Sequence, residues 1–199
     1  MGATVLYMSV SLDGFVAGPN VRDDNGLGDG GTRLHEWVLS GEGSEVGPPG
    51  LVSAGVNGQV AREFMATGAV VAGRGTFEPA GGWGGDHHDG VPVVVLSRRP
   101  PGIDVSGWPR VSYTDDVREA FDRAREAAGE KDVLVHGAAT ARLALAAGAL
   151  DELELHLVPV LLGSGTTLFD HSGQPAELER TRVLLGEGGV THLHYRVLR

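Results

Sequence analysis

Four short apolar runs, each closed by a turn-forming or polar residue, constrain the fold of this chain more than any other feature. The runs are residues 3–10, 69–72, 91–96 and 132–136. Each has few polar residues, so each predicts a strand that is buried on both faces. Segments with helical periodicity are expected at 60–66, 116–128 and 137–147, with Thr114 to Asp116 as cap candidates for the second. Alternating buried strands and helices predict a mainly parallel sheet with helices on its faces.

The C-terminal part of the chain has a different pattern, in which apolar and polar residues alternate. The strands expected there are residues 152–158, 178–185 and 190–198. Alternation is typical of half-exposed strands that pair antiparallel. It places His156, His192 and His194 on the polar faces, where we expect exposed histidines. A zinc site is the alternative if two of these strands pair.

Composition excludes several classes of function. Asp and Glu outnumber Lys and Arg by 26 to 16, and the net charge of −10 argues against nucleic-acid binding and against an anionic membrane surface. The chain has no Cys, which excludes disulfides and thiolate chemistry. It has no signal peptide and no membrane-spanning run, so we expect one cytoplasmic domain over residues 1–199.

Loops compatible with phosphate binding follow three of the apolar runs. The first contains Gly73, Arg74 and Thr76, where a helix start offers free N–H groups to an anion and Thr76 can also cap the helix. The second contains Ser97 and Arg98, a hydroxyl and a guanidinium that suit a phosphate monoester. The alternatives are an ordinary strand–turn–helix joint for the first loop and a solvated basic turn for the second.

The third loop follows the fourth run and is built from small residues. It comprises His136, Gly137, Ala138, Ala139 and Thr140, which allow a backbone to approach a pyrophosphate closely. The spacing is not the G-x-G-x-x-G of a Rossmann fold, and no Gly-Lys-Ser/Thr loop occurs. Small residues at a helix start are common, so this loop is weak evidence alone. Because parallel sheets bind ligands at the carboxyl ends of their strands, the three loops together predict a dinucleotide site.

Two further loops are candidates for the substrate side. Residues 11–18 follow the first run, where Asp13 is a candidate polar contact or, alternatively, satisfies N–H groups within a turn. Residues 81–89 place Trp83 among glycines, where its ring can stack on a flat ligand. The acidic and histidine residues that follow Trp83 match no metal motif, so we expect a solvated loop there and no bound metal.

The chain resembles the dihydrofolate reductase superfamily, in the branch of the reductase domain of riboflavin biosynthesis. The resemblance is carried by SLDGFVAG at 11–18, GRGTFE at 73–78, LSRRP at 96–100 and HGAATARLALAAGALDELELHLVPVLLGSGTTLFD at 136–170. It implies a three-layer α/β/α fold, with a mixed, mainly parallel sheet and antiparallel C-terminal strands. It also implies NADPH as hydride donor and a homodimer.

The resemblance assigns roles to the loops identified above. Arg74 and Thr76 would serve the phosphates, and Ser97 and Arg98 the 2′-phosphate of the adenosine. The remaining cofactor contacts would come from Val16, Ala17, Gly73 and residues 136–140. Phe15 and Trp83 would face the substrate. Phe15 stands where riboflavin-pathway reductases usually have Lys, which favours a flatter, less phosphorylated substrate.

We therefore expect an NADPH-dependent reductase that acts on a C=N or C=O bond of a small heterocycle. Asp13 is the candidate acid, with a bound water as the other proton source. Two alternatives remain. One is a non-catalytic NADPH-binding protein. The other is the 5-amino-6-(5-phosphoribosylamino)uracil reductase of riboflavin biosynthesis.

Overall fold

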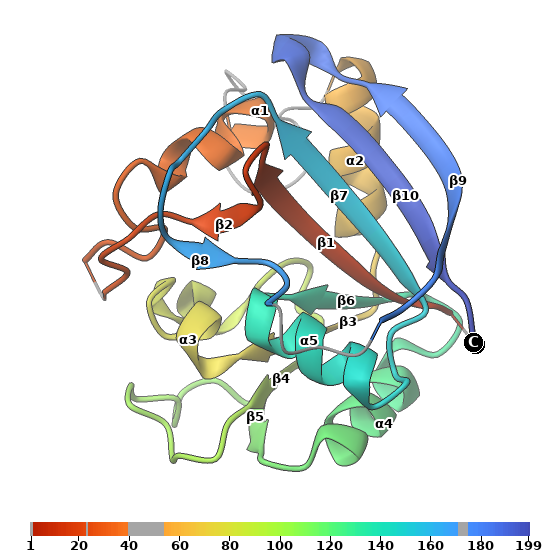
Figure 1. The fold of residues 1–199 in the computed structure, drawn as a ribbon. Coiled ribbons are helices and arrows are strands. Elements are labelled where there is room, and N and C mark those ends of the chain that lie inside the picture. Colours follow the sequence, from red (N-terminus) through yellow and green to blue (C-terminus); the bar gives the residue numbers. More distant parts are fainter. Residues whose placement is uncertain (1, 23, 40–53, 171–174) are drawn as a thin grey trace.

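The structure, a computed structural model, describes residues 2–22, 24–39, 54–170 and 175–199 (Figure 1). Within these residues the strands form an eight-stranded sheet, in the order β5-β4-β3-β6-β1-β7-β10-β9, and a two-stranded sheet of β2 and β8. The strands are β1 (Thr4–Ser11), β2 (Phe15–Ala17), β3 (Ala69–Gly73), β4 (Val93–Leu96), β5 (Val111–Thr114), β6 (Val133–His136), β7 (Glu152–Val158), β8 (Thr166–Thr167), β9 (Leu178–Leu185) and β10 (Thr191–Val197). The helices are α1 (Glu36–Leu39), α2 (Gly55–Met65), α3 (Arg74–Phe77), α4 (Val117–Ala128) and α5 (Ala138–Ala146), with 3₁₀ turns η1 (Gly31–His35), η2 (Gly81–Gly85) and η3 (Glu187–Gly189).

The sheet is mixed and mainly parallel, which confirms the expected fold class. Strands β5, β4, β3, β6, β1 and β7 run parallel, whereas β10 runs antiparallel to both β7 and β9. The antiparallel pairing expected for residues 152–158 is confirmed with β10, and β7 also pairs in parallel with β1, with Leu6 opposite Leu153. The reason is that α5 carries the chain back across the sheet before β7 begins, as in other parallel crossovers.

Helices cover both faces of the sheet and make three layers. Figure 1 shows α4 and α5 on the near side of the parallel strands and α2 behind the sheet. The near-side core joins strand residues such as Leu6 and Val135 to Phe121 and Ala141 of the two helices. No described helix is long and apolar enough to cross a membrane.

The start of α4 is set by a capping residue next to it in the sequence, whereas the start of α2 is not. The side chain of Asp116 accepts hydrogen bonds from the N–H groups of Arg118 and Glu119 at 2.8 and 3.1 Å, so the cap expected near 114–116 is confirmed. Helix α2 begins at Gly55, five residues before the expected start at residue 60. Its first N–H groups, of Val56 and Asn57, donate to the carboxylate of Glu187 at 3.0 Å each. Because Glu187 is so distant in the sequence, no residue near the start of α2 predicts this cap.

The polar faces of β7 and β10 are buried around Glu154, His156 and His192, contrary to the expectation of exposed histidines, whereas His194 is half-buried. Glu154, His156 and His192 are 1%, 4% and 0% exposed, because α1 and α2 pack over this face. Arg182 on β9 donates to Glu154 at 3.1 Å and to Glu63 of α2 at 2.6 and 2.9 Å, and so links the sheet to the helix. The alternation is therefore real, but the polar side faces a helix and not solvent.

Candidate functional site

The three loops singled out in the sequence lie side by side at one edge of the sheet. They follow β4, β3 and β6, which are neighbours in that order and run parallel. In the register, Gly73 pairs with Leu96, and Ala72 pairs with His136. The loops that begin at Arg74, Ser97 and Gly137 therefore leave the same edge of the sheet, where open parallel sheets bind ligands.

Two glycine–threonine contacts join the first and third loops. A Cβ on Gly137 would lie 2.2 Å from Oγ1 of Thr76, and a Cβ on Gly73 would lie 3.0 Å from Oγ1 of Thr140. Gly137 also has a φ of +96°, a conformation that favours glycine. Oγ1 of Thr140 is buried and has no hydrogen-bond partner among the described residues. The glycine backbone of each loop thus packs against a threonine side chain of the other, and the unpaired hydroxyl of Thr140 lies between the two loops.

The first turn of α5 presents backbone donors at this edge. The N-cap residue is Gly137, no side chain hydrogen-bonds the helix start, and no acidic residue lies in the first turn. The free N–H groups and the positive end of the helix dipole therefore favour an anion here. Ala138 and Thr140 are buried, whereas Ala139 is exposed.

Arg74 is paired with Glu78, which in turn is held by the loop that follows β4. Its Nη1 donates to Oε2 of Glu78 at 3.1 Å, and Oε1 of Glu78 accepts from the N–H of Gly102 at 2.7 Å. Burial, and next the carboxylate of Glu78, raise the pKa of Tyr113 to about 12. Thr76 does not cap α3, as the sequence had suggested. It lies inside α3, because this helix begins at Arg74 directly after β3 and has Gly73 as its N-cap.

The second loop is stabilised by its own turn. Oγ of Ser97 accepts from the N–H of Arg99 at 3.0 Å and donates to the carbonyl of Arg99 at 2.7 Å. Arg98 is exposed beside this turn. The arrangement fixes the backbone of the turn and leaves the guanidinium of Arg98 at the sheet edge.

Asp13 ties the loop after β1 to the loop after β7. Its carboxylate accepts from the N–H groups of Leu162 and Gly163 at 3.1 and 2.7 Å, and from Oγ of Ser11 at 2.6 Å. These hydrogen bonds, that of Ser11 first, lower the pKa of Asp13. The carboxylate is therefore ionised at neutral pH and has no proton to give. The carboxylate therefore serves a loop far along the chain, through Leu162 and Gly163, as well as its own turn, through Ser11 and the backbone of Asp13.

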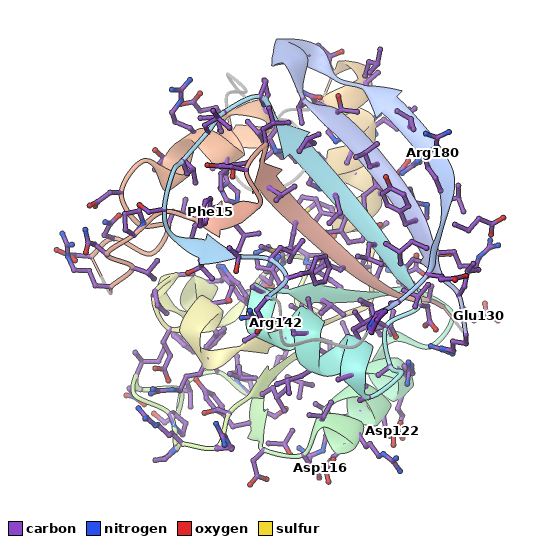
Figure 2. The ribbon with its side chains drawn as sticks, in the orientation of Figure 1. Phe15, Asp116, Asp122, Glu130, Arg142 and Arg180 are labelled. Atoms are coloured by element: carbon purple, nitrogen blue, oxygen red, sulfur yellow. The ribbon has the colours of Figure 1, made fainter. Side chains whose placement is uncertain are left out.

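The neighbouring residues of this segment form β2. Figure 2 shows Phe15 on this short strand, which pairs with β8. The side chain of Val16 is buried in the core between the sheet and α5, so only its backbone can face a ligand. Ala17 is half-buried.

Aromatic rings gather beside the end of β6. The ring of Trp83 lies 6.0 Å from that of His136 and 4.5 Å from that of His87, measured between ring centroids. Trp83 has a φ of +50°, which is unusual for a non-glycine residue and is held by the packing around it. Nδ1 of His136 lies 3.2 Å from the carbonyl of Tyr7, so Nδ1 carries the proton. Burial, and then His35, lower the pKa of His136 to about 4, which keeps its ring neutral at pH 7.

The loop with Asp86, His87, His88 and Asp89 is not simply solvated. The two aspartates are exposed, as expected, but His88 is buried and its Nε2 lies 3.2 Å from the carbonyl of Thr67. Nδ1 of His87 lies 2.7 Å from Nδ1 of His88, and burial lowers the pKa of His87 to about 2. Both histidine rings pack against Phe64, and that of His87 also packs against Trp83, so they lie among aromatic side chains and not in solvent.

A pocket of about 560 Å³ lies further along the same edge of the sheet, where β7 ends. Its lining includes Arg33, Glu36, Trp37, Asn57, Val158 and Glu187. Sequence reasoning missed this pocket. Residues 34–39 have a short amphipathic pattern in the sequence, but this pattern gives no indication that Trp37 turns toward β7.

Comparisons with known proteins agree with this fold. The model of the RibD C-terminal domain family matches residues 4–191. Among solved structures, a putative riboflavin biosynthesis protein from Shewanella sp. PV-4 matches with a TM-score of 0.71 and 20% identity, covering 99% of each chain. A pyrimidine reductase-like protein from Corynebacterium diphtheriae matches with a TM-score of 0.60 and 16% identity, covering 100% of this chain and 92% of the other.

A third solved structure is longer than this chain. RibD from Acinetobacter baumannii matches with a TM-score of 0.58 and 16% identity, covering 100% of this chain but 59% of that protein. No curated protein sequence matches. Identities this low show a shared fold, whereas the family match spans nearly the whole sequence. The chain therefore belongs to the RibD C-terminal domain family.

Proposed function

We propose that this protein is an NADPH-dependent reductase that transfers a hydride to a C=N or C=O bond of a small, flat heterocycle. Membership of the RibD C-terminal domain family supports a reductase of the riboflavin-pathway type. The observation that carries the cofactor assignment is the meeting of three strand ends at Gly73, Leu96 and His136, beside the uncapped start of α5.

The phosphates of the cofactor fit the donors at this edge. The N–H groups of Ala138 and Ala139 suit the pyrophosphate, because a helix start favours negative charge. The buried hydroxyl of Thr140 needs an acceptor, and a ligand oxygen would satisfy it. Arg98, with Ser97, suits the 2′-phosphate, and Arg74 lies on the neighbouring loop. Gly73, Gly137 and the backbone of Val16 and Ala17 would complete the contact surface.

The substrate side is assigned to the rings near β6. When bound, NADPH supplies the hydride, and the protein's residues position the acceptor. Trp83 offers a face for a flat ring, and neutral His136 lies next to it. Phe15 adds an apolar wall from β2. Asp13, held ionised, fastens the covering loops, and we assign the proton that completes the reduction to water.

A thermal-shift titration tests the cofactor assignment. NADPH should raise the melting temperature more than NADH does, because only NADPH carries the 2′-phosphate that Arg98 would contact. A ligand present at about 100 times its dissociation constant adds about 2.7 kcal/mol of stability. Arg98→Ala should reduce the difference between the two cofactors. Arg180→Ala, on the far edge strand β9 (Figure 2), is the matched control and should leave the difference intact. Equal shifts with NADPH and NADH in the wild type would contradict the proposal.

The riboflavin-pathway reductase is the second candidate, and the names of the structural neighbours favour it. Oxidation of NADPH should be followed with the aminopyrimidine ribosyl phosphate and, separately, with pterins, quinones and aldehydes. Turnover of the ribosyl phosphate alone would select this candidate. Turnover of an unphosphorylated heterocycle would select the broader assignment, which the apolar Phe15 favours. Binding of NADPH without any turnover would instead select a non-catalytic cofactor-binding protein.

We also propose a homodimer formed through the sheet face opposite α2. On β7, β10 and β9 no described helix covers this face (Figure 1). Its apolar residues are Leu155, Leu157, Val183, Leu185, Leu193 and Tyr195. Leu185 is 76% exposed, and apolar patches of this kind mark interaction surfaces.

Light scattering after size-exclusion chromatography measures the assembly state. The wild type should run at twice the chain mass of 20.7 kDa, and Leu185→Glu should give monomers. Leu143→Glu, at an exposed position on α5, is the matched control and should remain dimeric. A monomeric wild type would contradict the dimer.

A further inference from the structure

We propose that Glu154, His156 and His192 form a binding site for a divalent transition-metal ion, best suited to Zn²⁺, in the layer between the sheet and α2. The site is separate from the proposed cofactor loops and does not rest on the proposed reductase activity. The three residues come from adjacent positions of the paired strands β7 and β10, where His156 lies opposite His192.

The three side chains converge. One ligand atom from each lies within 4.8 Å of the others, and this is the only such group among the described residues. Nδ1 of His156 lies 2.9 Å from Nδ1 of His192. Nitrogen atoms that bind one tetrahedral Zn²⁺ at 2.0–2.1 Å are about 3.3 Å apart, so the imidazoles need to separate by only a few tenths of an ångström.

Asn57 fixes the orientation and protonation of His192. Nδ2 of Asn57 donates to the carbonyls of Trp37 and Glu187 at 3.1 and 3.2 Å, which turns Oδ1 of the amide toward His192. Oδ1 lies 3.0 Å from Nε2 of His192, so Nε2 must carry the proton. Nδ1 is then unprotonated and directs its lone pair at His156. Histidine ligands of metals are commonly held in this way by an acceptor on the other ring nitrogen.

An unpartnered carboxylate oxygen of Glu154 also points to a bound cation, independently of the two histidines. Glu154 is 1% exposed, and its Oε2 is paired with Arg182 at 3.1 Å. Its Oε1 is buried and has no hydrogen-bond partner among the described residues. A buried carboxylate oxygen without a partner is costly, and a metal ion would satisfy it. Two imidazoles and one carboxylate are the protein ligands of many zinc sites that keep a fourth position open.

Binding of the ion would displace a proton. His156 donates from Nδ1 to the bare Nδ1 of His192; when the metal binds, His156 gives up this proton at Nδ1 and takes one up at Nε2, so its ring stays neutral. The surroundings tolerate the added positive charge, because the two carboxylates of Glu63 and Glu154 share a single guanidinium, that of Arg182. Trp37 and Asn57 both contact the histidines and both line the 560 Å³ pocket, which gives the ion a route from solvent.

Metal titration of the untagged, chelator-stripped chain tests this site. Co²⁺ should bind with a stoichiometry of one per chain and give the visible absorption of a low-symmetry, nitrogen- and oxygen-ligated ion. Zn²⁺ should displace it, and the affinity should fall at acid pH, because protons then compete with the metal for the imidazoles and the carboxylate. Absence of any stoichiometric Co²⁺ or Zn²⁺ binding by the folded wild type would overturn the proposal without reference to a variant.

Variants locate the ion. His192→Gln and Glu154→Gln should each weaken Zn²⁺ binding by more than about 100-fold, since even the loss of an outer partner of a ligand costs about 10- to 100-fold. Asn57→Ala should fall in that smaller range. His87→Gln is the matched control, because His87 and His88 make a similar pair at 2.7 Å without a third ligand among the described residues. Circular dichroism would verify that each variant folds, and binding that survives in folded Glu154→Gln and His192→Gln would overturn the assignment.

Discussion

At the scale of single residues, the site depends on glycines that permit two loops to touch. Gly137 is the clearest case: its φ of +96° disfavours a side chain, and a Cβ added to it would lie only 2.2 Å from Oγ1 of Thr76. The sequence identified this residue through the run of small residues before a helix. It could not identify Thr76 as its neighbour, because that contact depends on β3 and β6 being adjacent in the sheet.

Gly137→Ala should lower the free energy of unfolding by about 1–3 kcal/mol, the range for a side chain forced into a left-handed conformation. It should also weaken NADPH binding, because Thr76 must move. Chemical denaturation and a binding titration would measure the two effects. Gly148→Ala is the control for backbone strain alone. Gly148 follows α5 and has a φ of +65°, and a Cβ added to it would have no atom within 4 Å. Loss of cofactor binding in both variants would contradict the contact argument.

At the scale of elements, a polar layer joins β7, β10 and β9 to α2. Arg182 holds the carboxylates of Glu63 and Glu154, and this link positions α2 over the sheet. This layer explains why the alternating pattern of the C-terminal strands gave a wrong prediction of exposure. Charged residues expected to face solvent are paired with a residue of a helix instead. No local feature of residues 152–158 distinguishes the two arrangements.

Arg182→Ala should destabilise the fold by about 3 kcal/mol. This is the low end for breaking a buried pair, because Arg182 and Glu63 are each 31% exposed. Urea denaturation would measure the loss. The double variant Arg182→Ala, Glu154→Gln should recover part of it, since it removes the buried charge that lost its partner. The coupling would be contradicted if Glu154→Gln lowered the free energy of unfolding by the same amount in the Arg182→Ala background as it does in the wild type.

The features that the sequence did not predict, strand β5 and the first turn of α2, have non-local or weak signals. Strand β5 has four half-buried residues at the edge of the sheet, so its pattern is short and incomplete. Helix α2 begins without a local capping residue, because Glu187 serves as its acceptor. By contrast, the mainly apolar strands β1, β3 and β6 and the amphipathic α4 were predicted closely. Their burial depends mainly on their own composition.

At the scale of the whole molecule, buried neutral histidines should make the fold sensitive to acid. Burial lowers the pKa values of His87, His136 and His192 to about 2, about 4 and about 4. For a group with a lowered pKa, the stability contribution is present above the unfolded value of 6.5 and is lost as the pH falls toward the folded value. Glu154 acts in the opposite direction, because burial raises its pKa.

The free energy of unfolding, measured in urea with a chelator present, should therefore fall between pH 7 and pH 5. Each histidine contributes up to about 2 kcal/mol of this loss, from about 1.4 kcal/mol per unit of pKa shift, and Glu154 offsets part of it. His136→Gln should reduce the slope. Equal stability at pH 7 and pH 5 would contradict the prediction.

The central claim is that the ends of β4, β3 and β6 together bind a phosphorylated dinucleotide. A crystal structure of the NADPH complex tests it most directly. We expect pyrophosphate oxygens within hydrogen-bond distance of the N–H groups of Ala138 and Ala139, and the 2′-phosphate against Arg98. A cofactor bound instead in the pocket lined by Trp37, or away from this edge of the sheet, would contradict it.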